Sequence, residues 1–231
     1  MLGWHYHKPD GTAVGSNIGV ISRYPIVRTV GDGKLGATIQ LPSGGTFTLF
    51  NVHFAHAPYQ PYQLLNIPYA NAPFLKTTEE AVAAANMARR SQVEALLAAI
   101  KQDAGAVAVV TGDFNEPSCL DWTPAVAAAK RQPLVVEWPA TKALLDVGFM
   151  DAFRKVHPDP IERPGMTWTP TTRTDDPKDH HDRIDFVLVR GKAAVQAVEV
   201  VGETKERADV VVTPYPSDHR AVVATLKLTK P

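Results

Sequence analysis

The sequence has 231 residues, with 24 Lys and Arg against 24 Asp and Glu, so its formal net charge is zero. Hydrophobic residues make up 45% and charged residues 21%, which is ordinary for a globular protein with a substantial core. The neutral balance argues weakly against a partner bound mainly through many phosphates, although a local basic patch is compatible with it. No apolar run approaches the length of a membrane span, and residues 1–10 lack the basic-then-apolar order of a signal peptide.

The first third of the chain predicts β-structure. His5 and His7 would share one face of a short strand, but with no evident third ligand a solvated pair is expected rather than a metal site. Residues 17–27 predict a strand, a break at a proline and the start of a second strand. Residues 34–40 and 46–53 alternate apolar and polar side chains around a Gly-rich turn, which predicts an antiparallel hairpin that ends in His53.

A long irregular segment and a helix follow. Residues 54–76 are rich in Pro, Tyr, Gln and Asn, and a loop of this length is usually functional or mobile. Its tyrosines are equally compatible with lining a substrate groove and with covering a sheet edge. Residues 77–80 have the composition of a helix start, and apolar residues at helical spacing predict an amphipathic helix to about Lys101.

Residues 107–117 hold the most informative strand. Four apolar residues predict a buried strand, and Gly112 ends it just before Asp113 and Asn115. A strand that delivers an acid and an amide into a loop favours chemistry at its end. The single cysteine, Cys119, excludes an intrachain disulfide and is expected to be a small, part-buried residue.

The last third predicts two short helices, over residues 122–130 and 141–146, and three strands, over 183–189, 195–201 and 221–228. Asp185 lies among apolar neighbours and must have a partner, because an unpaired buried charge is costly. Asp179, His180, His181 and Asp182 are adjacent and cannot all face one ion, so a solvated loop is expected there. No repeat or linker is evident, and one domain over residues 1–231 is predicted.

Polar residues recur at the ends of the predicted strands. Carboxylates, an amide and histidines without cysteine suit a hard cation such as Mg²⁺ or Mn²⁺ and an oxyanion such as phosphate. A serine-nucleophile mechanism is disfavoured because no Gly-x-Ser-x-Gly elbow is present. The set comprises His53, Asp113, Asn115, Asp185, Asp218 and His219.

These residues fall in five motifs that, in this order, resemble those of the endonuclease/exonuclease/phosphatase superfamily, whose fold is deoxyribonuclease I-like. The motifs are Ile-Ser-Arg-Tyr-Pro-Ile at 21–26, Asn-Val-His at 51–53, Gly-Asp-Phe-Asn at 112–115, Arg-Ile-Asp-Phe at 183–186 and Ser-Asp-His at 217–219. The resemblance implies an α/β fold, a four-layered α/β sandwich of two mostly antiparallel sheets flanked by helices. It also implies metal-dependent hydrolysis of a phosphoester.

The resemblance further implies a role for each site residue. His219 would be the general base that activates water, and Asp185 would hold its imidazole. Asp218, Asp113 and Asn115 would bind the metal, with Asp113 and Asn115 also positioning water and phosphate. His53 would hydrogen-bond a phosphate oxygen. Arg23 is a candidate phosphate ligand, or equally a structural ion-pair partner.

The sequence departs from the family pattern at its start. Family members begin with an Asn-bearing strand and a strand ending in Gln-Glu, whose Glu is the main metal ligand, and residues 1–16 match neither. An N-terminally incomplete domain, about its C-terminal three quarters, is therefore expected. The alternative is a non-catalytic module that binds a phosphorylated ligand. The substrate stays open among small, lipid-like and nucleic-acid phosphoesters, with a slight preference against large duplex DNA.

Overall fold

Two β-sheets that pack face to face form the centre of the computed structural model, which describes residues 3–9 and 18–228. In these residues the larger sheet has six strands in the order β3-β4-β5-β6-β8-β7. All neighbours in it are antiparallel except β5 and β6. The strands are β3 Ile26–Val30, β4 Gly36–Gln40, β5 Thr46–His53, β6 Val107–Asp113, β7 Met150–Asp151 and β8 Asp185–Gly191.

The smaller sheet has the order β10-β9-β11, with β9 Ala193–Gly202, β10 Val210–Val211 and β11 Ala221–Leu228. Its long pair, β9 and β11, is antiparallel. A separate antiparallel pair joins β1 His5–His7 to β2 Val20–Ser22. His7 Nε2 lies 2.9 Å from the carbonyl oxygen of Gly33, so this ring nitrogen has a backbone partner.

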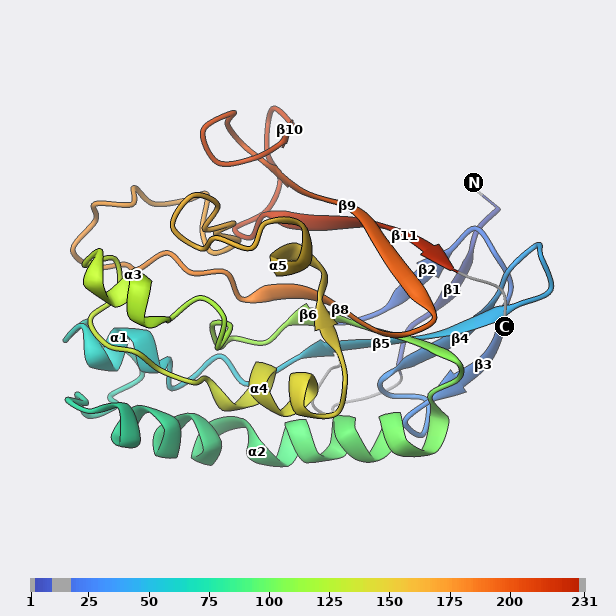
Figure 1. Cartoon of the computed structure of the whole chain (residues 1–231), viewed down its shortest axis with the longest axis horizontal. Helices are drawn as coiled ribbons and strands as arrows, with labels where there is room; N and C mark the ends of the chain where they lie inside the picture. Colours follow the sequence, from blue (N-terminus) through green and yellow to red (C-terminus); the bar gives the residue numbers. More distant parts are fainter. Residues whose placement is uncertain (1–2, 10–17, 229–231) are drawn as a thin grey trace.

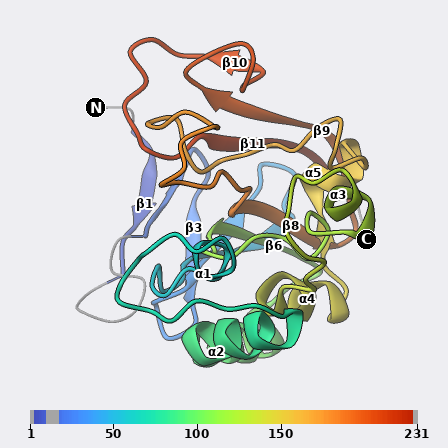
Figure 2. The ribbon, with the colours of Figure 1, turned by 90° about the vertical axis from the view of Figure 1, so that its left-hand side faces the viewer.

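Two helices, α2 Thr78–Asp103 and α4 Pro139–Asp146, cover the outer face of the larger sheet, and Figure 2 shows them below it with the smaller sheet above. The longest, α2 Thr78–Asp103, begins with a capping box in which the Thr77 and Glu80 side chains bond each other's backbone amides. This confirms the predicted helix start. The other helices are α1 Gln60–Leu64, α3 Pro124–Ala128, α4 Pro139–Asp146 and α5 Ala152–Val156.

The main core lies between the larger sheet and helices α2 and α4. Phe50, Val110 and Leu188 of the sheet are fully buried against Leu96 of α2 and Leu144 of α4. Burying a side chain of this size contributes about 1.5–3 kcal/mol. A second core joins β8 to β9, β11 and α5 and holds the two sheets together.

Strand register places three polar residues side by side. The parallel pairing of β5 with β6 sets His53 opposite Asp113, and the antiparallel pairing of β6 with β8 sets Asp113 opposite Asp185. Gly112 permits this close approach, because its φ is +129° and a Cβ there would lie 1.9 Å from the carbonyl oxygen of Val52. The end of the larger sheet where β6 finishes and β8 begins is on the left in Figure 1, and β11 of the smaller sheet begins on the same side.

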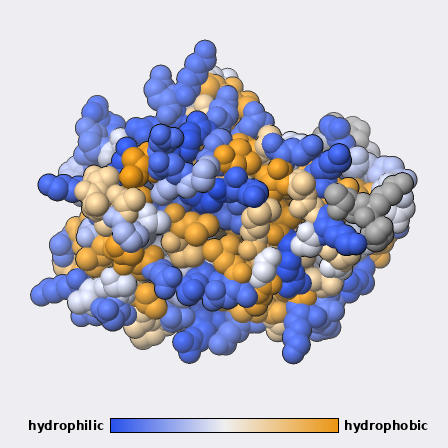
Figure 3. All heavy atoms as spheres, viewed as in Figure 1, coloured by the Kyte–Doolittle hydropathy of each residue, from blue (hydrophilic) through white to orange (hydrophobic). Residues whose placement is uncertain are grey.

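The predicted α/β sandwich, the hairpin of β4 and β5 and the long helix are confirmed. Residues 54–76 are less irregular than expected, since they contain α1. Asn17, the first residue of a predicted strand, lies outside the described residues. No helix among the described residues has the length and apolar character needed to cross a membrane. Hydrophilic residues dominate the rim of the molecule in Figure 3, and hydrophobic ones gather nearer the middle.

Candidate active site

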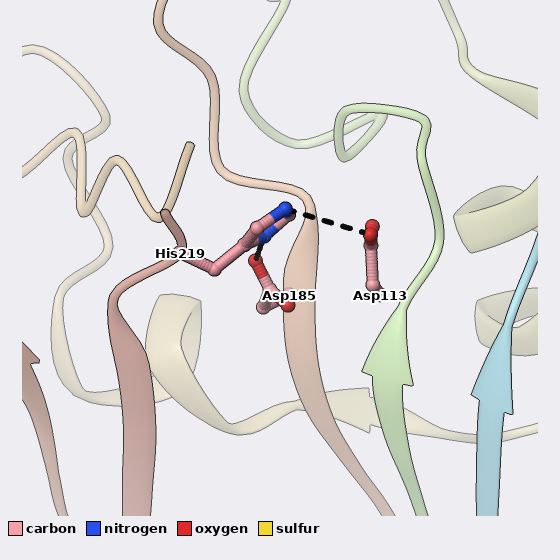
Figure 4. A group of neighbouring side chains, drawn as sticks. All are labelled: Asp113, Asp185 and His219. Carbon is pink, nitrogen blue, oxygen red and sulfur yellow. Dashed lines mark hydrogen bonds and ion pairs between the residues drawn. The ribbon is translucent and has the colours of Figure 1, made fainter. Parts of the chain in front are cut away.

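Asp113, Asp185 and His219 meet at the end of the larger sheet and form the pocket cluster (Figure 4). His219 Nδ1 lies 2.9 Å from Asp185 Oδ2, and its Nε2 lies 3.8 Å from Asp113 Oδ2. When Nδ1 carries the proton and donates it to Asp185, Nε2 is left as an acceptor that faces Asp113. A histidine held in this way can take a proton from a water molecule.

The loop before β11 fixes the position of His219. Its backbone amide donates to Ser217 Oγ at 3.1 Å, and its carbonyl accepts from the Tyr215 hydroxyl at 2.9 Å. The ring of Trp168 packs edge-on against the imidazole, with 5.0 Å between ring centroids. These contacts restrict both the backbone and the ring, so the imidazole stands ready in one orientation.

A tight turn after β6 orients Asp113. Asn115 has φ of +48°, and its backbone amide donates to Asp113 Oδ1 at 2.7 Å. The Asn115 side-chain amide donates to Asp113 Oδ2 at 2.9 Å and to the carbonyl oxygen of Phe54 at 3.1 Å. Asn115 is therefore a buried support that aims the carboxylate of Asp113, and it ties β6 to the chain that leaves β5.

The pocket cluster lies in a cavity of about 540 Å³, within the range of small-ligand sites. His53 lies on its wall with Nε2 3.5 Å from Asp113 Oδ2, and 39% of its side chain is exposed. The other lining residues are His56, Tyr59, Tyr62, Tyr69, Asn115, Trp168, Ile184, Ser217 and Asp218. The lining of the cavity thus combines aromatic rings with carboxylates.

The two histidines of the cavity are shifted in opposite directions. Burial lowers the pKa of His53, and the charge of His219 lowers it further. Burial also opposes protonation of His219, but the hydrogen bond and charge of Asp185, with the charge of Asp113, outweigh it and raise the pKa of His219. Burial, then the charge of Asp185, raises the pKa of Asp113 to about 7. Near neutral pH, His53 is therefore more often uncharged than His219, and His219 is the stronger base.

The donor set fits a divalent cation. Asp113 and Asp218 bring carboxylates to the cavity, and no Lys or Arg is among the described residues that line it. The grouping of potential ligand atoms within 4.8 Å of one another is Asp113, Asp185 and His219, which differs from the set expected from sequence. Asp185 already accepts from His219. Asp113 and Asp218 are the other carboxylates that line the cavity, and Asp218 lies outside this group.

Two sequence expectations meet a different environment. Arg23 does not line the cavity, and its guanidinium lies 5.1 Å from the ring centroid of Trp4. The prediction that residues 179–182 form a solvated loop is wrong. Asp182 is buried and accepts from the Tyr59 hydroxyl at 2.8 Å and from Trp122 Nε1 at 3.0 Å. This loop is a structural support beneath the cavity.

Sequence reasoning missed Trp168, which belongs to no motif that it used. Its approach to His219 depends on backbone pairing between loops distant in sequence, since Trp168 pairs with both Asp182 and His219. The tyrosines of residues 54–76 line the cavity, so of the two alternatives, lining a groove or covering a sheet edge, the structure favours the first. Cys119 is part-buried as expected, and burial raises the pKa of its thiol.

Comparison with known proteins assigns the family. The model of the Endonuclease/Exonuclease/phosphatase family matches residues 2–219. The chain belongs to this family. A curated relative, an uncharacterized protein of Caenorhabditis elegans, is 27% identical over 206 residues, which are 83% of this chain. The matched region spans 63% of the length of that relative.

Solved structures agree on the fold of this family member. An AP endonuclease from Archaeoglobus fulgidus has a TM-score of 0.56 at 16% identity, covering 98% of this chain and 80% of its own. The 3' phosphatase NExo from Neisseria, solved with a product DNA hairpin, has a TM-score of 0.53 at 20% identity, covering 99% and 80%. Enzymes of this family are phosphoester hydrolases, and at these identities the structures establish the fold alone.

Proposed function

We propose that this protein hydrolyses a phosphoester with water activated by His219 and with help from a bound divalent cation. The observation that carries the proposal is the hydrogen bond of 2.9 Å between His219 Nδ1 and Asp185 Oδ2, in a cavity that also holds Asp113 and His53. Family membership supports the reaction class. The geometry supports the assignment of roles.

His219 acts as the general base. Its Nε2 accepts a proton from the attacking water, while Asp185 holds the ring in the required tautomer and stabilises the imidazolium that forms. The oxygen of water forms the new bond to phosphorus as the bond to the ester oxygen breaks. The ester oxygen then takes a proton from solvent, and His219 releases its proton to solvent. General-base catalysis of this kind contributes about 10²- to 10⁴-fold to the rate.

Asp113 and His53 act beside the base. Asp113 Oδ2 lies within 3.8 Å of both imidazoles, so it is suited to orient water between them. His53, whose pKa is lowered by burial, donates from Nε2 to a phosphate oxygen as negative charge develops there. Asn115 keeps Asp113 in place through its two hydrogen bonds to the carboxylate.

Asp113 and Asp218 would hold Mg²⁺ or Mn²⁺, with Asn115 in support. When bound, the ion would neutralise charge on the phosphate and polarise its oxygens. The carboxylates themselves favour such a partner, because both line one cavity whose described lining has no Lys or Arg. Carboxylate oxygens are the ligands that Mg²⁺ prefers.

Hydrolysis of a substrate panel tests the proposal. The panel comprises plasmid DNA, an aryl phosphodiester, inositol phosphates and sphingomyelin, each with Mg²⁺ or Mn²⁺. We expect turnover of at least one substrate and a loss of about 10²- to 10⁴-fold in His219→Ala. Turnover that His219→Ala leaves intact would refute the role of the base.

A second candidate is a module that binds a phosphorylated ligand without turnover. His53 favours it, because this partly exposed imidazole on the cavity wall can donate to a phosphate oxygen without any reaction following. It predicts binding of a phosphate ester with equal affinity in the wild type and in His219→Ala, and no metal-dependent product. Release of product by the wild type in the presence of a divalent cation, lost in His219→Ala, distinguishes the two.

A further inference from the structure

The cavity beside the pocket cluster has a continuous aromatic wall. Tyr59 packs edge-on against Tyr62 with 4.9 Å between ring centroids, and Tyr62 packs edge-on against Tyr69 at 5.7 Å. The ring of His56 lies 6.4 Å from that of Tyr69. Trp168 brings the wall to His219, where the ring centroids are 5.0 Å apart. One end of the wall therefore touches the proposed base.

The polar ends of the inner rings are already bound within the protein. The Tyr59 hydroxyl donates to Asp182 at 2.8 Å, and the Tyr62 hydroxyl donates to Asp179 in a short hydrogen bond. Trp168 Nε1 also donates to Asp179, at 3.1 Å. Because these groups are satisfied elsewhere, the wall offers ring surface to a ligand rather than hydroxyl and indole donors.

The segment that carries the tyrosines is firmly anchored. Arg89, buried in α2, donates to Gln60 Oε1 at 2.6 Å and to the carbonyl oxygen of Pro58 at 3.0 Å. Gln63 Nε2 donates to the carbonyl oxygen of Pro73 at 2.7 Å. A ligand that packs on this segment pays little ordering entropy, because the wall is held in place before binding.

The charge of the cavity limits the number of phosphates. Its described lining holds Asp113, Asp185 and Asp218 and no Lys or Arg. Ligands with several phosphates are normally held by Arg and Lys side chains. One phosphate can be matched by the proposed cation and the cavity histidines, whereas additional phosphates would face carboxylates and ring surface.

We propose that the substrate carries a single phosphoester with a planar aromatic ring close beside it, and that this ring packs on Tyr69 and Trp168. The proposal rests on the proposed function, because it assigns the phosphate to the pocket cluster. A nucleobase on a short, single-phosphate linkage and an aryl ester share this chemistry. The cavity of about 540 Å³ has room for such a ligand.

A matched pair of substrates tests the ring. Dithymidine monophosphate and its analogue with both bases replaced by hydrogen have the same phosphodiester, and in both the leaving oxygen is a deoxyribose hydroxyl oxygen. We expect kcat/KM to be about 5- to 150-fold higher with the bases, since stacking a base on an aromatic side chain contributes about 1–3 kcal/mol. Equal values for the two substrates would overturn the ring proposal and leave the proposed function standing.

Variants of Tyr69 locate the ring. Tyr69→Ala should remove most of the preference for bases, and Tyr69→Phe should retain it, because the ring rather than the hydroxyl makes the contact. Tyr24→Ala is the control, since Tyr24 is 41% exposed against 38% for Tyr69 and does not line the cavity. A preference unchanged in Tyr69→Ala would place the ring elsewhere and overturn the assignment.

A binding measurement keeps the inference separate from catalysis. Calorimetry on His219→Ala, which should not consume the ligand, compares thymidine 5'-monophosphate, phenyl phosphate, deoxyribose 5-phosphate and inositol trisphosphate. Tighter binding of both aromatic ligands supports the ring site, and their order tells a nucleobase from a simple aryl group. Tightest binding of inositol trisphosphate or of deoxyribose 5-phosphate would refute it. Failure of the proposed function alone would appear as ring-dependent binding without turnover of either dinucleoside substrate.

Discussion

Two groups of charged residues flank the start of β8, and they are built in opposite ways. Arg183 belongs to a buried ionic cluster in which it contacts Asp121 at 2.9 Å and Asp151 at 2.8 Å, while Arg154 also contacts Asp121. Every side chain of this cluster is at most 11% exposed, and its two Arg match its two Asp. Asp185, two residues later, faces the pocket cluster.

The pocket cluster lacks such a match. Its side chains are 15–24% exposed, and its carboxylates share one imidazole. Burial opposes the charge of Arg183, but Asp121 and Asp151 outweigh it and raise its pKa, whereas burial and a like charge raise the pKa of Asp113. Charges that are paired and buried hold the fold together, and charges left unmatched at an open cavity are available to a ligand.

Removal of divalent cations should have the largest effect, because it leaves the unmatched carboxylates without their proposed partner. We expect EDTA to reduce hydrolysis to the background rate and Mn²⁺ to restore it. Mn²⁺ at 100 times its Kd should also stabilise the fold by about 2.7 kcal/mol, measured as a rise in Tm. Asp113→Asn should show a smaller rise. Full activity in EDTA would mean that the carboxylates serve another purpose.

Loss of Arg183 should be the next largest effect and should act on stability. Arg183→Met leaves Asp121 and Asp151 buried with fewer partners, so we expect a loss of about 3–5 kcal/mol in the free energy of unfolding, measured in urea. Arg190→Met is the control on β8, the strand that follows Arg183, because Arg190 is only part-buried, and it should cost less than about 1 kcal/mol. Similar costs at the two positions would abolish the contrast between paired and exposed charges.

Much of the pocket cluster is predictable from sequence for a simple reason. Asp113 and Asp185 each lie at the end of an apolar strand, and strand ends in one sheet meet at its edge. His219 lies just before the last strand, β11, which belongs to the smaller sheet, so its place beside Asp185 depends on how the two sheets pack. The residues were recognisable because local pattern and sheet geometry agree there.

The supports of the cluster were not predictable in this way. Asp121 and Arg154 lie 33 residues apart, in a loop and a short helix, and no periodicity links them. Asp182 was expected in solvent, because a run of polar residues says nothing of the tyrosine and tryptophan that surround it in space. Arg23 fits a motif but lies beside Trp4, since a motif fixes the backbone position and not the partner of a long side chain.

His53 allows a smaller test within the cavity. His53→Ala removes the proposed donor to the phosphate, so we expect about a 10²-fold fall in kcat/KM, equivalent to roughly 2.7 kcal/mol. Its stability should stay within about 1 kcal/mol of the wild type, because the ring is 39% exposed. His157→Ala is the control, since His157 contacts the carbonyl oxygen of Val198 and does not line the cavity. An equal loss in both variants would show that histidine removal acts through the fold.

The smallest expected effect is a shift in the pH dependence of the rate. A general base must be unprotonated, so the rate should rise with pH, and the raised pKa of His219 sets the midpoint above the ordinary value of 6.5. Asp185→Asn removes the hydrogen bond and charge that raise this pKa and leaves burial, which lowers it, so the midpoint should move to lower pH. The variant, slower at pH 8, should therefore lose proportionally less activity at pH 6. A midpoint that stays in place would mean that another group, such as Asp113, controls the fall in rate at low pH. The pairing of Asp185 with His219 would then be structural, like that of the buried ionic cluster.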